Sequence, residues 1–227
     1  MADYINKNIL SQAYIHVEPV ALDSEEDIER LKQHIKDFAR TRSDFYLHPD
    51  VDVEIEFEEG SLKARVTVIG TLFLLLQGVS NYPDFREGAV LLYNDSKRLA
   101  EYIVSEMQFL SGAKHQDVIR LESRTGVVGS LNKVTRQLAY IRRASEGSLS
   151  ASEITTQLQE VQDEIKKLLE NLSDQQDIEL VTNGLKSLAD TIPSIPKPPK
   201  ERTNSPTAIG LYQRERRSLR RYFALDE

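Results

Sequence analysis

The segment from Val51 to Val68 alternates apolar and polar residues in two runs, and this pattern restricts the fold more than any other part of the chain. Successive side chains of a β-strand point to opposite faces, so each run predicts a strand with one apolar face. Glu59-Gly60 separates the runs and favours a two-residue turn between antiparallel strands. The turn sets a register that matches both faces, with pairs Phe57–Leu62, Ile55–Ala64, Val53–Val66, Glu56–Lys63 and Glu54–Arg65.

Helical patterns flank this hairpin. Acidic residues after Ser24 and apolar residues at helical spacing predict an amphipathic helix over 24–41. A second, longer helix is expected from Phe85 to about Ser111, with Gly112 at its end. Residues 14–22 favour a short strand, and 71–80 a short buried helix. The N-terminal part is therefore predicted to be an α+β domain over residues 1–113, with helices packed on a small antiparallel sheet that contains the hairpin 51–69.

The next part of the chain, residues 114–190, predicts a helical bundle segment. Apolar residues recur there at alternating steps of three and four in three successive stretches, which is the seam pattern of packed helices. Capping boxes at Ser150-x-x-Glu153 and Ser173-x-x-Gln176 would begin the second and third helices. Each seam is short, which favours packing within one chain, and self-association is the alternative. The residues proposed for this bundle or oligomer seam are Ile154, Leu158, Val161, Ile165, Leu168 and Leu172.

Proline and arginine dominate the end of the sequence. Residues 191–206 contain five prolines and predict an extended linker, and residues 207–227 a basic amphipathic helix. The net charge is −7, but residues 197–225 hold eight basic and two acidic residues, so this segment is +6 and the rest −13. Such a division of charge concerns partners rather than fold.

The basic tail is the strongest candidate for binding a partner. Arginine binds carboxylates and phosphates, and interleaved apolar side chains can fill pockets. A protein partner, a second copy, the chain's own acidic part, nucleic acid and an anionic membrane all suit these side chains. The acidic remainder would repel nucleic acid, which makes a protein the preferred partner. The predicted partner-binding residues are Arg214, Arg216, Arg217, Leu219, Arg220, Arg221, Tyr222 and Phe223.

Composition excludes several classes of site. The chain has no cysteine, which rules out disulfides, thiolate metal sites and a cysteine nucleophile. A cysteine-free chain also fits a reducing compartment, so we expect a cytoplasmic protein. The N-terminal residues lack a signal-peptide pattern. The most apolar stretch, residues 66–79, is shorter than the roughly twenty residues of a membrane-spanning helix.

Two short motifs could carry chemistry, and both have simpler structural explanations. His48-Pro49-Asp50-x-Asp52 groups possible metal ligands but is also typical of a turn before a strand. Gly126-x-x-Gly129 could admit a phosphate, although close helix packing explains it better. No metal, cofactor or catalytic residue is predicted. We therefore expect a non-enzymatic interaction subunit or adaptor. The alternatives are a nucleic-acid-associated protein and an enzyme whose site is assembled from scattered residues.

Overall fold

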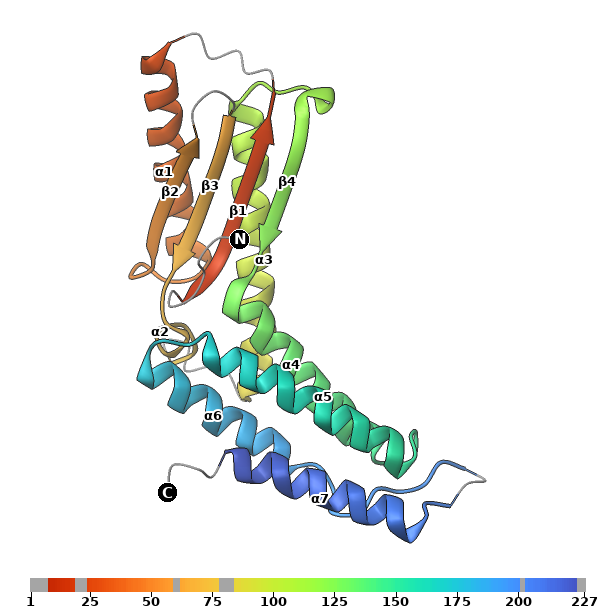
Figure 1. The fold of residues 1–227 in the computed structure, drawn as a ribbon. Coiled ribbons are helices and arrows are strands. Elements are labelled where there is room, and N and C mark those ends of the chain that lie inside the picture. The colour runs from red at the N-terminus through yellow and green to blue at the C-terminus, as the bar shows by residue number, and fades with distance from the viewer. Residues whose placement is uncertain (1–7, 19–23, 59–61, 78–83, 201–202, 224–227) are drawn as a thin grey trace. The chain divides into compact units, whose positions relative to one another are not determined.

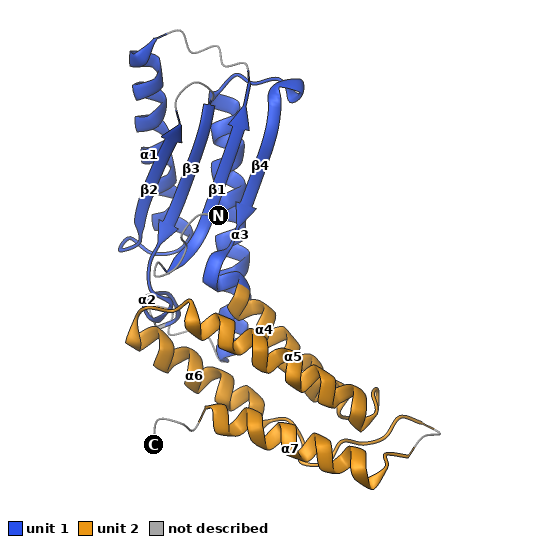
Figure 2. Cartoon of the chain, in the orientation of Figure 1, with its two compact units in different colours: residues 1–129 blue, residues 130–227 orange. Residues whose placement is uncertain are grey.

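The computed structural model describes residues 8–18, 24–58, 62–77, 84–200 and 203–223 (Figure 1). The chain divides into two compact units, residues 1–129 and 130–227 (Figure 2). In chain order, the elements are β1 (Ile9–Val17), α1 (Glu25–Tyr46), β2 (Asp52–Glu58), β3 (Leu62–Ile69), α2 (Leu72–Gln77), α3 (Phe85–Leu110), the 3₁₀ turn η1 (His115–Asp117), β4 (Val118–Arg124), α4 (Gly126–Ala144), α5 (Ala151–Glu170), α6 (Gln175–Asp190) and α7 (Pro206–Tyr222). The α+β class is as the sequence predicts.

The N-terminal unit is a four-stranded antiparallel sheet in the order β2-β3-β1-β4. Helices α1 and α3 cover one face (Figure 1). This connectivity, in which a third strand separates the two strands that each helix joins, is the split βαβ arrangement of ferredoxin-like folds. The arrangement is compatible with many functions and identifies none of them.

The hairpin between β2 and β3 is confirmed, but its predicted register is wrong by two residues. Phe57 pairs with Ala64 and not with Leu62, and Glu56 pairs with Arg65. A shift of two residues leaves every side chain on its predicted face, so alternation alone cannot distinguish the two registers. The predicted turn, Glu59-Gly60, lies outside the described residues.

The sequence prediction missed the fourth strand. Residues 118–124 pair with β1 as β4, although they lie in the range 114–190 that was predicted to be a helical bundle segment. Gly126 then starts α4 with a φ of +43°, and an added Cβ would lie 1.9 Å from the backbone oxygen of Ile9. The glycine is therefore needed for close approach to β1, and this approach accounts for the first half of the Gly-x-x-Gly motif.

The helices agree more closely with the sequence. Ser24 caps α1, which runs five residues beyond the predicted end, and Asp84 caps α3. The capping box of Ser150 and Glu153 begins α5 as predicted. For α6 the prediction is wrong by one residue, because Asp174 accepts the capping hydrogen bonds in place of Ser173.

Candidate functional site

The basic segment at the end of the chain forms one helix, α7. The Ser205 side chain accepts a hydrogen bond from the Ala208 backbone at 3.2 Å, and Pro206 occupies the first turn, where no intrahelical N–H partner is needed. Arg220 and Arg221 lie in the last turn, where the helix dipole favours positive charge. The local sequence therefore provides a capped start and a favourably charged last turn for this helix.

One side of α7 is buried in the helical unit. Tyr212 and Leu219 are fully buried and Phe223 is 6 % exposed, and α7 packs mainly along α5. Tyr222 is half-buried, and burial together with the charge of Glu170 raises its pKa. Two of the apolar residues predicted to meet a partner, Leu219 and Phe223, are thus occupied by packing within the chain itself.

The proline-rich segment before α7 is held along the same unit. Two of its backbone oxygens accept hydrogen bonds from side chains of α7. The Tyr212 hydroxyl donates to the Pro193 oxygen, and the Arg216 Nε donates to the Ile192 oxygen at 2.8 Å. The Lys197 backbone N–H donates to the Ser145 oxygen at 2.8 Å. Hydrogen bonds therefore fix residues 192–197, so this part of the segment does not stand away from the unit as a free spacer.

The opposite side of α7 carries arginines. Arg214, Arg217 and Arg221 are exposed, and no ion pair joins them to a carboxylate within the described part of the chain. The Arg217 Nε donates to the backbone oxygen of Gln213 at 3.2 Å. Spacings of three and four residues place the three side chains on one side of the helix. We call these three residues the arginine stripe.

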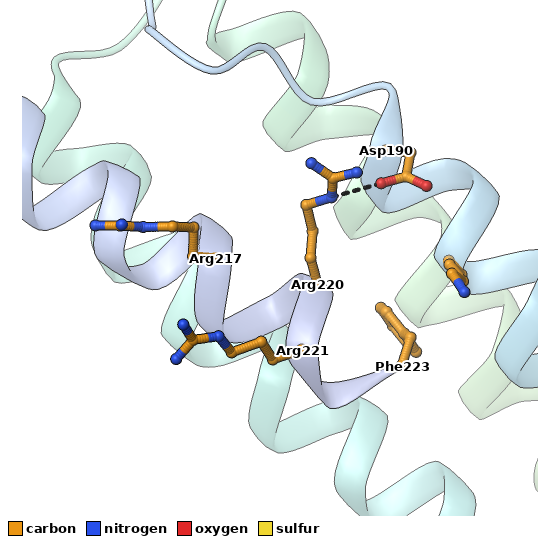
Figure 3. Close-up of a pocket in the computed structure, with 6 residues that line it drawn as sticks. Asp190, Arg217, Arg220, Arg221 and Phe223 are labelled. Atoms are coloured by element: carbon orange, nitrogen blue, oxygen red, sulfur yellow. Dashed lines mark ion pairs between the residues drawn. The ribbon is translucent and has the colours of Figure 1, made fainter. Parts of the chain in front are cut away.

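A shallow pocket lies where α7 meets α6, with a volume of about 300 Å³ (Figure 3). Arg220 reaches Asp190 across it, with 2.6 Å between Nε and Oδ1, whereas Arg217 and Arg221 extend away from that carboxylate (Figure 3). Four basic side chains and one carboxylate make the pocket strongly positive. Its lining residues are Lys186, Asp190, Arg217, Arg220, Arg221 and Phe223.

Lys186 and Asp190 were not predicted as site residues. They lie four residues apart on α6, and nothing in their own sequence neighbourhood indicates that α7 passes beside them. Only the fold brings them to the arginines. Arg216 was predicted to bind a partner, but its Nε donates to a backbone oxygen within the chain.

The residues proposed as a bundle or oligomer seam are buried within the helical unit. Ile154, Leu158, Val161, Ile165 and Leu168 have no measurable exposure, and Leu172 is 6 % exposed. The side of α5 that they form is therefore covered in a single chain.

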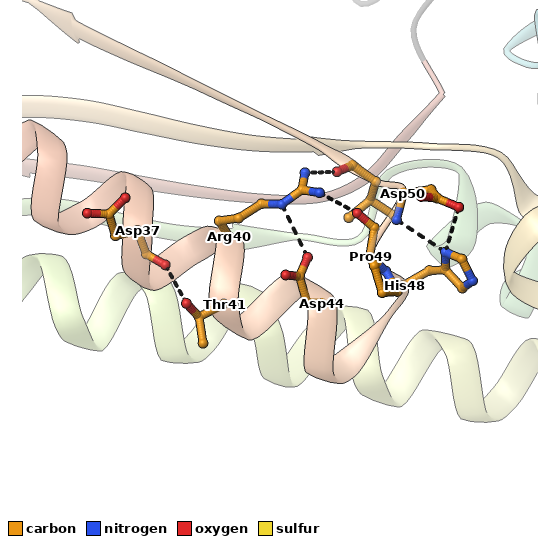
Figure 4. A network of polar contacts seen from close by, with 8 residues as sticks. Asp37, Arg40, Thr41, Asp44, His48, Pro49 and Asp50 are labelled. Carbon is orange, nitrogen blue, oxygen red and sulfur yellow. Dashed lines mark hydrogen bonds and ion pairs between the residues drawn. The ribbon is translucent and has the colours of Figure 1, made fainter.

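The possible metal ligands near His48 belong to a turn between α1 and β2. The His48 Nδ1 accepts a hydrogen bond from the Asp50 backbone at 3.2 Å (Figure 4). The Arg40 guanidinium holds the turn by donating to the backbone oxygens of Pro49 and Val51, and its Nε lies 3.2 Å from Asp44 Oδ1. Among the described residues, no three His, Asp or Glu side chains are close enough together to bind a metal ion.

Titratable groups with a raised pKa do not gather in the pocket. Burial raises the pKa of the Asp95 carboxyl, which the charge of Arg98 partly offsets, but Asp95 lies on α3 in the other unit. Burial also raises the pKa of Tyr212, whose hydroxyl is engaged by Pro193. Among the described residues that line the pocket, Asp190 is the one carboxylate, and it is paired with Arg220.

Comparison with protein-family models, with curated proteins and with solved structures gives no match for this chain. None of the helices in the described ranges combines the length and apolar character needed to cross a bilayer. The candidate site therefore rests on its own geometry.

Proposed function

We propose that this protein is a non-enzymatic interaction subunit that binds an acidic surface of a partner protein through the arginine stripe of α7. The observation that carries the proposal is that Arg214, Arg217 and Arg221 share the outward side of a helix whose other side is fixed by packing. They span about 10 Å along the helix. A rigid helix holds these arginines at set spacings, which lowers the entropy lost on binding.

Arginine offers a partner more than a positive charge. Its planar guanidinium donates two parallel hydrogen bonds to a carboxylate, so it recognises position as well as charge. The helix dipole explains basic residues in the last turn of α7, but it gives no reason for Arg214 and Arg217. The adjoining pocket adds the cation of Lys186, and its open volume could hold a side chain of the partner.

A protein partner is favoured over nucleic acid by the position of the aromatic residues. Single-stranded nucleic acid is bound by basic grooves that also present aromatic faces to the bases. The rings of Tyr212 and Phe223 are buried and that of Tyr222 is half-buried, so no fully exposed aromatic ring accompanies the arginines on the outward side of α7. The −13 charge of the residues outside 197–225 also opposes a phosphate backbone.

Charge reversal with a matched control tests the proposal. The variant R214E/R217E/R221E removes the stripe, and R136E/R142E/R143E makes the same change at three exposed arginines of α4. Both variants and the unchanged chain are used for affinity purification from the native source, and each co-purifying protein is then purified and titrated. We expect an acidic protein whose Kd rises at least about 100-fold with the α7 variant and little with the α4 variant.

Two outcomes would overturn the proposal. One is that the same proteins bind the α7 variant as tightly as the unchanged chain. The other is that the stripe is needed only for labelled single-stranded RNA or DNA, with binding that weakens steeply as salt rises.

A further inference from the structure

The two edges of the sheet differ in a way that points to a second interaction surface. In the described residues no strand lies beyond β4 or β2, so each leaves one row of backbone groups available for pairing. On β4, Ile119 is 56 % exposed and Leu121 is 38 % exposed. Exposed apolar residues on an unpaired edge favour the addition of another strand.

The edge at β2 carries charge of a single sign. Every second residue of this strand from Glu54 to Glu58 is a glutamate, and these three glutamates share one face of the sheet. Two β2 strands placed side by side would bring glutamates opposite one another, which is destabilising. This edge is therefore protected against pairing with itself.

The edge at β4 carries alternating charge. Arg120, Glu122 and Arg124 share the sheet face that α1 and α3 leave uncovered, opposite His16, Tyr14 and Gln12 of β1. An antiparallel partner of the same sequence, centred on Leu121, would place Arg120 opposite Glu122 of the second copy, and Glu122 opposite Arg120. We propose that the protein forms a dimer in which two β4 strands pair antiparallel about Leu121.

The charges select this register over its neighbours. Paired residues must share a face of the sheet, and the nearest alternative centres are Arg120 and Glu122. Centring on Arg120 brings two arginines together, and centring on Glu122 brings two glutamates together. Only the register centred on Leu121 combines opposite charges on one face with contact between the two Leu121 side chains on the other.

The proposed dimer also keeps each layer continuous. A two-fold axis perpendicular to the sheet leaves α1 and α3 on the same face in both copies, and the two sheets become one of eight strands. The apolar seam on α5 is covered within the chain, so self-association through β4 does not compete with it. Glu122 already accepts hydrogen bonds from Arg120 and Arg124, and a carboxylate has room for a further donor from the second copy.

Charge exchange tests the pairing in the full chain. Light scattering after size-exclusion chromatography should give the mass of a dimer for the unchanged protein. Arg120→Glu or Glu122→Arg alone places like charges opposite each other twice in the dimer and should raise the dissociation constant about tenfold or more. The double variant R120E/E122R restores opposite charges and should restore the dimer. Two results would overturn the proposal. One is a protein that is monomeric at about 100 µM, a concentration at which weak dimers are populated. The other is a dimer whose dissociation constant is raised by neither single change.

A cross-link tests the register. The chain has no cysteine of its own, so an introduced cysteine can form a disulfide only with the same cysteine of a second copy. Leu121→Cys places two thiols opposite each other at the axis and should give a disulfide-linked dimer under mild oxidation. Ser123→Cys on the same strand face is the control, because the two thiols would lie about 13 Å apart, beyond the reach of a disulfide. Equal cross-linking of the two variants would contradict the register. The α7 variant R214E/R217E/R221E should leave both results unchanged, and loss of the dimer in that variant would place the interface elsewhere.

Discussion

The uncovered face of the sheet and the outward side of α7 are both rich in charge, but they use it differently. On the sheet, each basic residue of β3 and β4 lies beside a carboxylate, as in Arg65 with Glu56 at 2.8 Å and Lys63 with Glu58 at 3.1 Å. On α7, the arginine stripe has no carboxylate partner among the described residues. The same residue types thus stabilise the fold in one unit and are available for binding in the other.

The arginines of the sheet also act on the groups beside them, namely the Glu122 carboxylate and the Tyr14 ring. Partial burial raises the pKa of Glu122, but hydrogen bonds and charge from Arg120 and Arg124 outweigh it, and the net shift is downward. Two arginines also lie against the Tyr14 ring, Arg65 and Arg120, each 5.7 Å from its centroid. The guanidinium groups of Arg65 and Arg120 are therefore each engaged twice, by a carboxylate and by an aromatic face.

The largest expected effect concerns the inner side of α7. Leu219→Ala removes a fully buried side chain from its contact with the helical unit and should lower the free energy of unfolding by about 2–5 kcal/mol. Leu211→Ala is the control, because Leu211 lies on the same helix but is 49 % exposed, and it should cost less than about 0.5 kcal/mol. Urea denaturation followed by far-UV circular dichroism measures both. Equal losses would mean that α7 does not pack as described.

A smaller effect is expected when the same charge change is made in the two regions. Arg65→Glu places a glutamate opposite Glu56 and should destabilise the sheet by about 1 kcal/mol. Arg214→Glu breaks no ion pair in the described residues and should change stability by less than about 0.5 kcal/mol. Hydrogen exchange of peptides from β3 and α7 measures each change locally. A destabilised α7 in the second variant would show that its arginines support the fold after all.

Strong periodicity predicted much of this fold, and its limits explain the errors. The apolar seam on α5 and the face of α3 follow from helical spacing, and the structure has both. The hairpin register was missed because alternation repeats every two residues, so a shift by two gives the same pattern. Strand β4 was missed because Arg120, Glu122 and Arg124 face away from the helices and leave little apolar signal.

The sequence predicts only part of the candidate site. The spacing of Tyr212, Leu219 and Phe223 indicates that one side of α7 needs an apolar cover. It does not say whether the cover is the same chain or another one, since both satisfy the same pattern. Long-range packing decides this, and it also brings Lys186 and Asp190 of α6 to the arginines.

Helix α7 is a fixed member of the helical unit, which presents its arginines on a rigid support. Hydrogen exchange of the full chain, without any partner, tests this most directly. We expect the backbone amides of residues 209–222 to be protected to a degree similar to those of α5, because both helices open only when their shared apolar contact is lost. Exchange of the α7 amides at the rate of an unstructured peptide, with α5 still protected, would contradict it.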